Sequence, residues 1–171
     1  MPMITHGFDW PDRFVVGTVG VPGDRTFYLQ ATERDETVSV SLEKQQAGAL
    51  ADGVEQLLDT LRSSDATSIT IPDSTPDLLI DEEPLDMPLQ EKFRAGVLTL
   101  GWDPTTSQVV VEAAPPPELD LDQVEALQED PENFELEVEP DEVFIVRIPV
   151  GAARAFIDRT RSVVAAGRDS A

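Results

Sequence analysis

The sequence contains no cysteine and a single histidine, so several classes of chemistry are excluded at once. Without a thiolate the chain can form no disulfide, no iron–sulfur site and no cysteine nucleophile. The one histidine, His6, falls in an N-terminal stretch that we expect to be loose, and no G-x-S-x-G motif occurs. We therefore expect no catalytic residues, no cofactor and no metal site, although Asp, Glu, Tyr and Arg leave acid–base chemistry open.

Basic residues are scarce: 12 Lys and Arg stand against 34 Asp and Glu, which gives a formal net charge of −22. The imbalance is strongest between Arg94 and Arg147, where no basic residue occurs. A chain this acidic repels phosphate backbones and anionic lipid surfaces. We therefore expect neither a nucleic-acid partner nor a membrane partner.

Long hydrophobic runs are also missing, and residues 1–14 contain neither a basic segment nor an apolar one. These features argue against a membrane span and against a secretion signal, so we expect a cytoplasmic location. With 171 residues, of which 40% are hydrophobic, the chain is long enough for one buried core and short for two. We expect a single domain, residues 1–171.

Alternation of apolar and polar residues predicts three strands in the first half of the chain, at residues 14–20, 26–32 and 37–43. An amphipathic helix is predicted to follow them, because the apolar residues then keep helical spacing over four turns. Its apolar face consists of Ala47, Leu50, Ala51, Val54, Leu57, Leu58 and Leu61.

The second half repeats this order, with strands predicted at 94–102, 108–114 and 142–149 and a helix from about Gly151. The face predicted for this helix consists of Ala153, Phe156, Ile157, Thr160, Val163 and Val164. The hydrophobic patterns of the two halves match at an offset of 106 positions. Either a remote duplication or common packing rules would produce that match. We predict an α+β fold of two βββα units, with a mostly antiparallel sheet and two amphipathic helices packed on it.

Two segments fall outside this repeat. Residues 64–92 carry four prolines and are predicted to form a strap between the halves, with a possible short strand at 68–71. Residues 115–141 form an acidic, proline-bounded insertion that we expect to be mobile, with a short helix near "DQVEALQE". The carboxylates at 81–86 and 120–122 fit no calcium-loop pattern and lie in proline-rich loops, so we interpret them as solvated.

Glycines recur at Gly17, Gly20 and Gly23 between two predicted strands. The spacing matches neither the dinucleotide-binding pattern nor the P-loop, and both of those require a helix directly after the glycines. A strand follows here instead. Pro22 and Gly23 suit the two central positions of a type II turn, so we predict a hairpin turn comprising Gly20, Pro22 and Gly23.

Basic and amide residues flank this turn, and they are the candidate ligand-binding site. If the strand ends meet at one edge of the sheet, Arg13, Arg25, Lys44 and Gln45 would form a cationic cluster able to clamp a phosphate or carboxylate. The competing interpretation is structural. In that case each arginine pairs with a nearby aspartate, and Lys44 and Gln45 cap the helix.

Five stretches carry a resemblance to a known family: FDWPDRF, GTVGVPGDRTFYLQA, SVSLEKQQ, FRAGVLTLGWD and VVAAGR. They are similar to the actinobacterial domain-of-unknown-function 3090 family, whose members have no established activity. Members often continue past VVAAGR into a Cys/His tail like a zinc knuckle, but this sequence continues with DSA, so the resemblance implies no zinc role here. Relatives are encoded beside a phosphatase-like and a kinase-like protein, and either is a candidate partner.

Two functions are compatible with these observations. The first is a non-catalytic cytoplasmic binding or adaptor protein that acts through protein–protein contacts, which the acidic insertion and the missing catalytic residues favour. The alternative is a small-ligand-binding protein or an enzyme acting on a phosphorylated metabolite. It would use Arg13, Arg25 and Lys44 as the anion clamp and Gln45 or Asp24 for orientation. Convergence of these side chains on a concave pocket would favour the alternative.

Overall fold

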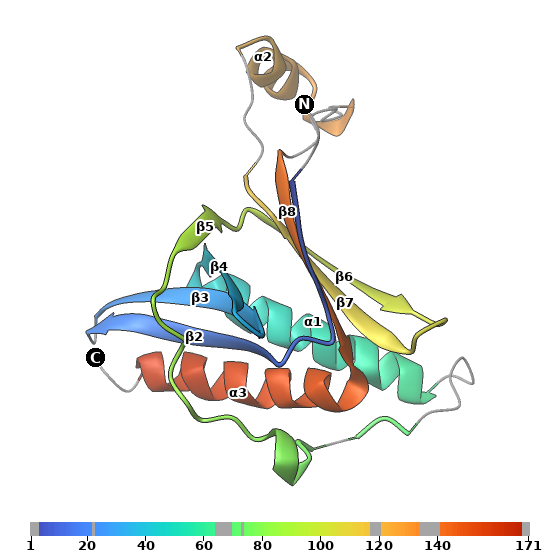
Figure 1. Ribbon diagram of the computed structural model, residues 1–171. Coiled ribbons are helices and arrows are strands. Elements are labelled where there is room, and N and C mark those ends of the chain that lie inside the picture. The colour runs from blue at the N-terminus through green and yellow to red at the C-terminus, as the bar shows by residue number, and fades with distance from the viewer. Residues whose placement is uncertain are drawn as a thin grey trace.

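A computed structural model of the chain describes residues 4–21, 23–63, 70–72, 74–116, 121–133 and 141–168 (Figure 1). Its elements follow in the order β1 Ile4–Asp9, β2 Arg13–Val21, β3 Asp24–Glu33, β4 Glu36–Leu42, α1 Lys44–Ser63, η1 Asp77–Leu79, β5 Glu91–Arg94, β6 Val97–Asp103, β7 Gln108–Ala114, α2 Leu121–Glu129, η2 Pro131–Asn133, β8 Glu142–Pro149 and α3 Val150–Arg168.

The strands form two four-stranded sheets. Sheet I has the order β2-β3-β4-β5 and sheet II the order β1-β8-β7-β6. Within each sheet the three strands predicted from the sequence pair antiparallel, as hairpin-connected neighbours do. The predicted α+β fold, with βββα repeated, is confirmed.

The fourth strand of each sheet comes from the other half of the chain. β1 precedes the first βββα unit but pairs parallel with β8, and β5 precedes the second unit but pairs parallel with β4. Corresponding backbone hydrogen bonds lie just beyond each added strand: Trp10 N donates to Arg147 O, and Ala95 N to Ser41 O, each at 2.8 Å. The two halves have therefore exchanged strands.

This exchange corrects the expectation of a loose N-terminal stretch. Residues 4–9 form β1, and His6 Nε2 lies 2.7 Å from Glu142 Oε1 on the adjacent strand. The stretch alternates Ile4, His6 and Phe8 on one face, and Phe8 is buried against Phe144 with the ring centroids 5.9 Å apart. Apolar burial at Phe8 and six paired positions with β8 hold the stretch in the sheet.

Helices α1 and α3 lie side by side and form the layer on which the sheets pack (Figure 1). Their predicted apolar faces are largely buried: Leu58 and Ile157 have no exposed surface. Phe156 of α3 is stacked on Phe14 of β2, with a centroid distance of 4.8 Å and an interplanar angle of 7°. One continuous core thus joins both sheets and both helices. No helix in the described ranges is long and apolar enough to cross a membrane.

The strap crosses the outer face of sheet I, on the side away from the helices, and leads into β5 (Figure 1). Leu85 is buried against Gly17 of β2, where a Cβ would lie 2.6 Å from the leucine side chain. The buried amide of Gln30 donates to Asp86 O, and its oxygen accepts from Asp86 N at 2.8 Å. The strap is therefore a third layer over sheet I.

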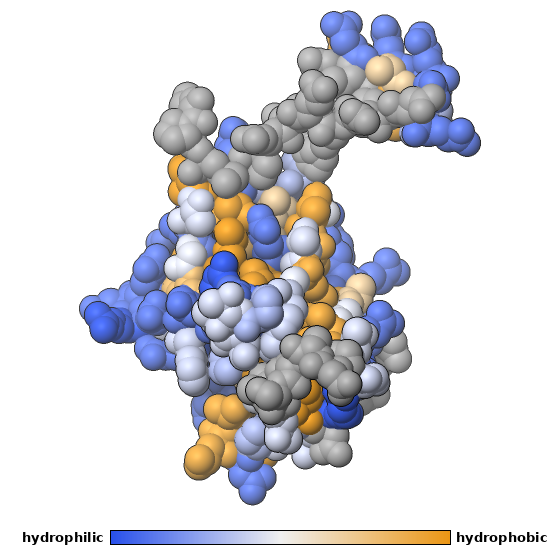
Figure 2. Space-filling model, turned by 90° about the vertical axis from the view of Figure 1, so that its right-hand side faces the viewer, coloured by the Kyte–Doolittle hydropathy of each residue, from blue (hydrophilic) through white to orange (hydrophobic). Residues whose placement is uncertain are grey.

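The remaining predictions concern segments that the structure describes in part. The short helix predicted in the acidic insertion is α2, and Figure 2 shows its mostly hydrophilic surface set apart from the main body. Residues 117–120 and 134–140 of the insertion lie outside the described residues, as do 64–69 of the strap. Thr70 and Ile71, the described part of the strand predicted at 68–71, belong to no strand.

Candidate functional site

A pocket of about 420 Å³ opens at the end of sheet I where β3 begins and β4 and β5 end. The antiparallel register places Phe27 opposite Leu42, and the parallel register places Arg94 opposite Ser41. Helix α1 begins directly after β4, so its first residue reaches the same place. The pocket is lined by Gly23, Arg25, Thr26, Phe27, Ser41, Leu42, Glu43, Lys44 and Arg94.

Three basic side chains and one carboxylate contribute to the lining, so the pocket is positively charged on a strongly acidic molecule. The carboxylate, Glu43 Oε1, accepts from Arg94 Nη2 at 2.7 Å, and both side chains are exposed. Within the described part of the chain, neither Arg25 nor Lys44 forms an ion pair. These two cations are therefore available to an anion from solution.

The start of α1 adds to this charge. Gln46 accepts a hydrogen bond from Glu43 N at 2.7 Å, in the manner of a capping box, and donates to Ala95 O at 3.1 Å. The first turn of α1 has no acidic residue, although acids are favoured at a helix N-terminus. Lys44 is found there instead, so a cation faces the positive end of the helix dipole. Such an arrangement favours an anion nearby.

Arg25 and Lys44, two of the four residues predicted for the clamp, line this pocket together, and Arg13 and Gln45 do not. Arg13 pairs with Thr32 across the β2–β3 hairpin, whereas Arg25 pairs with Gly20. The antiparallel register thus places the two arginines at opposite ends of the hairpin. Gln45 follows Lys44 on α1, is exposed, and lies outside the pocket lining because successive helical residues project in different directions.

Arg13 instead fastens the strap to the body. Its Nε and Nη2 donate to Asp81 Oδ2 and Oδ1 at 2.6 and 3.0 Å, and its Nη1 lies 3.2 Å from Asp86 Oδ1. Arg159 of α3 reaches the same carboxylate at 3.2 Å. Arg13 thus pairs with aspartates, as the structural interpretation held, but they are 68 or more positions away in the sequence and not the nearby ones expected.

The charges in this arginine–carboxylate cluster alter the pKa values of its members. Burial would raise the pKa of Asp81, but the hydrogen bonds from Arg13 and Glu83 N, together with the charges of Arg13 and Arg159, outweigh it. The pKa of Asp81 therefore lies below its ordinary value. Burial lowers the pKa of Arg159, and the hydrogen bond to Asp81 raises that of Arg13. Asp81 is thus ionised in the folded protein, and its carboxylate links the strap to β2 and α3.

The glycines next to the pocket have structural explanations. Gly23 has φ of 87°, the value that the third position of a type II turn requires, and β2 and β3 pair up to Val21 and Asp24 on either side of it. Gly20 has φ of 116°, and a Cβ there would lie 2.4 Å from Asp24 O. Pro22 lies outside the described residues, and Asp24, proposed to orient a ligand, is exposed and does not line the pocket.

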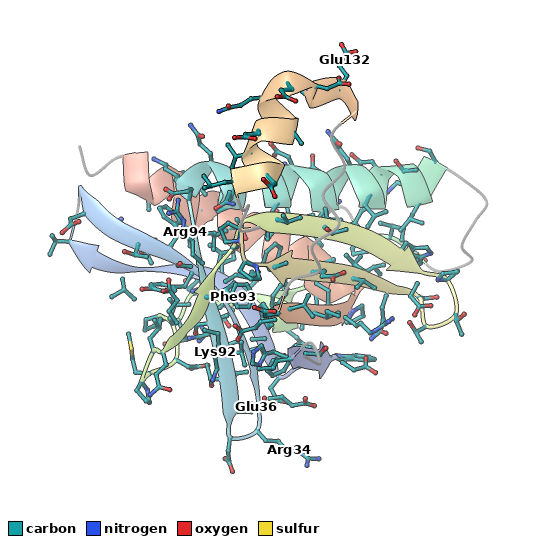
Figure 3. All side chains as sticks on the ribbon, turned by 90° about the horizontal axis from the view of Figure 1, so that it is seen from above. Arg34, Glu36, Lys92, Phe93, Arg94 and Glu132 are labelled. Carbon is teal, nitrogen blue, oxygen red and sulfur yellow. The ribbon has the colours of Figure 1, made fainter. Side chains whose placement is uncertain are left out.

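Arg94 is the pocket residue that sequence reasoning missed. It was assigned to the beginning of the strand at 94–102, whereas it ends β5 and lies beside β4 of the other half. Figure 3 shows Arg94 at one end of sheet I and Arg34 and Glu36 at the other. The available signal was the pattern of "EKFR", where buried Phe93 stands among three charged residues as in an edge strand.

In the described ranges, no three His, Asp or Glu side chains converge as a metal ion would require. The fold and site together define an α+β protein with a cationic surface pocket next to a helix N-terminus.

Comparison with protein families identifies the chain more closely. The model of a family described as "Protein of unknown function (DUF3090)" matches residues 6–171. The chain belongs to this family, as its five characteristic stretches predicted. Comparisons with curated proteins and with solved structures find no match.

Proposed function

We propose that the protein binds a small ligand through an anionic group, a phosphate or a carboxylate, in the pocket at the end of sheet I. The observation that carries the proposal is the pair Arg25 and Lys44, two cations without an ion-pair partner among the described residues that line one concave pocket. This is the alternative that the sequence left open, with Arg94 in place of Arg13 and Gln45.

The chemistry of the pocket suits such a ligand. Arg25 offers a planar fork of donors that matches two oxygens of a phosphate or carboxylate, and Lys44 offers a compact charge. Arg94 is held by exposed Glu43, so an incoming anion would compete for it. A volume of about 420 Å³ accommodates a metabolite rather than a bare ion. The proposed role is binding, with no residue assigned to catalysis.

Isothermal titration calorimetry with pyrophosphate and with citrate tests this proposal. We expect saturable binding of at least one probe to the wild-type protein. The double variant Arg25→Ala, Lys44→Ala should bind at least about tenfold more weakly, because each lost contact to a charged group contributes about 1.5–3 kcal/mol.

The matched control is Arg34→Ala, Lys92→Ala, which removes the same charge from two exposed side chains outside the pocket lining. Its affinity should stay within about twofold of wild type. Absence of binding by either probe, or an equal loss in both double variants, would contradict a specific site.

A second candidate function is the non-catalytic adaptor role in the cytoplasm, acting through protein–protein contacts. Exposed apolar side chains favour it: Trp10, Leu78 and Ile80 have 66%, 98% and 56% of their surface exposed. A phosphatase-like or kinase-like protein remains the candidate partner. Co-purification from the native cytoplasm would support this role if a stoichiometric partner were retained by both wild type and Arg25→Ala, Lys44→Ala.

A further inference from the structure

A second concavity, of about 720 Å³, lies between the strap, β2 and α3. The strap from Ile80 to Leu85 forms one wall, and residues of α3 from Ala155 to Ala166 form the other. Gly17 and Thr18 of β2 line it between these walls. The eleven helical steps from Ala155 to Ala166 span about 16 Å, so this strap–α3 groove is elongated.

Apolar and small side chains make up much of the groove. Ile80 has 56% of its surface exposed, and Pro84 of the strap is exposed as well. On α3, Ala155, Ser162 and Val163 are small enough to leave room above the helix. The groove therefore offers apolar surface to a ligand that brings apolar side chains.

Three carboxylates that line the same groove have no ion-pair partner within the described ranges. They belong to Glu82, Glu83 and Asp158, which are exposed; Asp158 accepts a hydrogen bond from Thr75. The one basic residue in the lining, Arg159, donates to Val16 O at 3.0 Å and to Asp81 O at 2.7 Å, and its charge is matched by Asp81. The groove is thus apolar and negatively charged.

We propose that the strap–α3 groove binds a short extended segment of a partner protein in which apolar residues alternate with lysine or arginine. About five extended residues would fill a length of about 16 Å, at roughly 3.3 Å per residue. Successive side chains of an extended segment point to opposite sides. Apolar side chains would therefore contact Ile80 and Val163 while the basic ones reach Glu82, Glu83 and Asp158. This site is separate from the anion pocket and independent of it.

Binding of the fluorescein-labelled pentapeptide Lys-Leu-Lys-Leu-Lys to the full-length protein, followed by fluorescence anisotropy, tests the proposal. The variant Glu82→Gln, Glu83→Gln should bind about tenfold more weakly, because two partly exposed ion pairs contribute about 1.4 kcal/mol in total. The control Glu125→Gln, Glu129→Gln removes the same charge from exposed positions on α2 and should change the affinity by less than about twofold.

Apolar contact is tested by Ile80→Ser, which keeps every charge and should also weaken binding several-fold. Since Ile80 is largely exposed, the variant should fold as wild type does, which thermal unfolding would verify. Amide chemical-shift changes on peptide addition should centre on Gly17, on 80–85 and on Ser162.

Several outcomes would overturn the proposal. If both glutamate variants bound the peptide equally weakly, or if the amide chemical-shift changes centred on α2, the overall negative charge of the protein would be attracting the peptide, and not the groove. Competition by spermidine at equal charge concentration would mean a site for small cations. Lack of saturable binding up to millimolar peptide would mean that no such segment binds.

Discussion

Asp81 joins the strap, β2 and α3, although it stands in a run of acidic residues that look alike in the sequence. Its carboxylate is bound by Arg13 and Arg159 and by the backbone N–H of Glu83. Sequence reasoning assigned the whole run 81–86 to solvated loops. Nothing local distinguishes Asp81 or Asp86 from Glu82, because the arginines that bind them come from distant parts of the chain.

The substitution Asp81→Asn should therefore lower the free energy of unfolding by about 2 kcal/mol at pH 7, since it removes the charge from hydrogen bonds to two arginines. The pKa of Asp81 is depressed in the folded protein, so the unfolded chain takes up the proton first on acidification. The stabilisation is thus complete above the ordinary carboxyl pKa of about 3.9 and is lost as the pH falls through the folded pKa.

Urea denaturation at several pH values measures this difference between wild type and Asp81→Asn. The difference should be constant near neutrality and should shrink below about pH 4. A difference that stays the same down to the lowest pH at which both proteins fold would show that the carboxylate charge is not what stabilises the strap.

At the scale of elements, the beginning of α1 carries a cation that is unfavourable for the helix but belongs to the proposed anion pocket. Lys44 is the first residue of a helix whose first turn lacks acidic residues. The substitution Lys44→Glu should stabilise the fold by about 0.3–1 kcal/mol through the helix dipole, and should weaken pyrophosphate or citrate binding at least about tenfold. Urea denaturation and calorimetry measure the two effects.

Gln45→Glu is the comparison variant, because it adds an acid one residue later and keeps Lys44, so it changes the charge by one unit where Lys44→Glu changes it by two. We expect about half the stabilisation with a smaller loss of affinity. If Lys44→Glu instead lowered stability, the helix-dipole argument would be wrong. If both variants lost affinity equally, Lys44 would have no specific role in the pocket.

The elements that sequence reasoning found are those whose pattern is local. The strands at 108–114 and 142–149 have the predicted bounds, and α1 and α3 bury most of the predicted faces. The fourth strand of each sheet was missed because β1 and β5 pair parallel with distant partners, and parallel pairing leaves no turn signal. Arg94 was missed for the same reason, since its neighbours in the pocket depend on that pairing.

Arg25 and Lys44 were placed together correctly because the order β3, β4, α1 brings the start of β3 and the end of β4 to one edge. The prediction was wrong for Arg13, which the register of the hairpin places far from Arg25. Arg13 lies ten positions before Gly23 in the sequence. At roughly 3.3 Å per residue, it is about 33 Å along the strand from the turn. The error concerned distance along a strand rather than the type of residue.

For the whole molecule, the exchanged strands predict that the halves stay together without a covalent link. A protease site placed between Ser63 and Thr70 would divide the chain after α1, in the first residues of the strap. After cleavage, β1 remains paired with β8 of the other fragment, and β4 with β5. We expect the cleaved protein to elute in size-exclusion chromatography as one particle of unchanged size, and the fragments to separate only in denaturant.

Separation under native conditions would mean that the two added strands and the shared helical layer contribute too little to hold the fragments. The uncleaved protein with the same inserted site is the control, because it shows whether the insertion itself disturbs the fold. A second cleavage site in the acidic insertion, between β7 and β8, should also leave one particle, since these strands pair with each other.

The strand exchange also bears on the order of events during synthesis. Ile4 lies opposite Glu142, so β1 leaves the ribosome long before its partner strand exists. At 5–20 residues per second, the wait lasts roughly 7–28 s. Meanwhile β2, β3, β4 and α1 can assemble as a hairpin-rich unit, but sheet I lacks β5 until the strap has been made. The first half of this protein therefore emerges with an unpaired strand and an open sheet edge. The edge is closed once β5 has been made, whereas β1 must be kept from other nascent chains until translation is nearly complete.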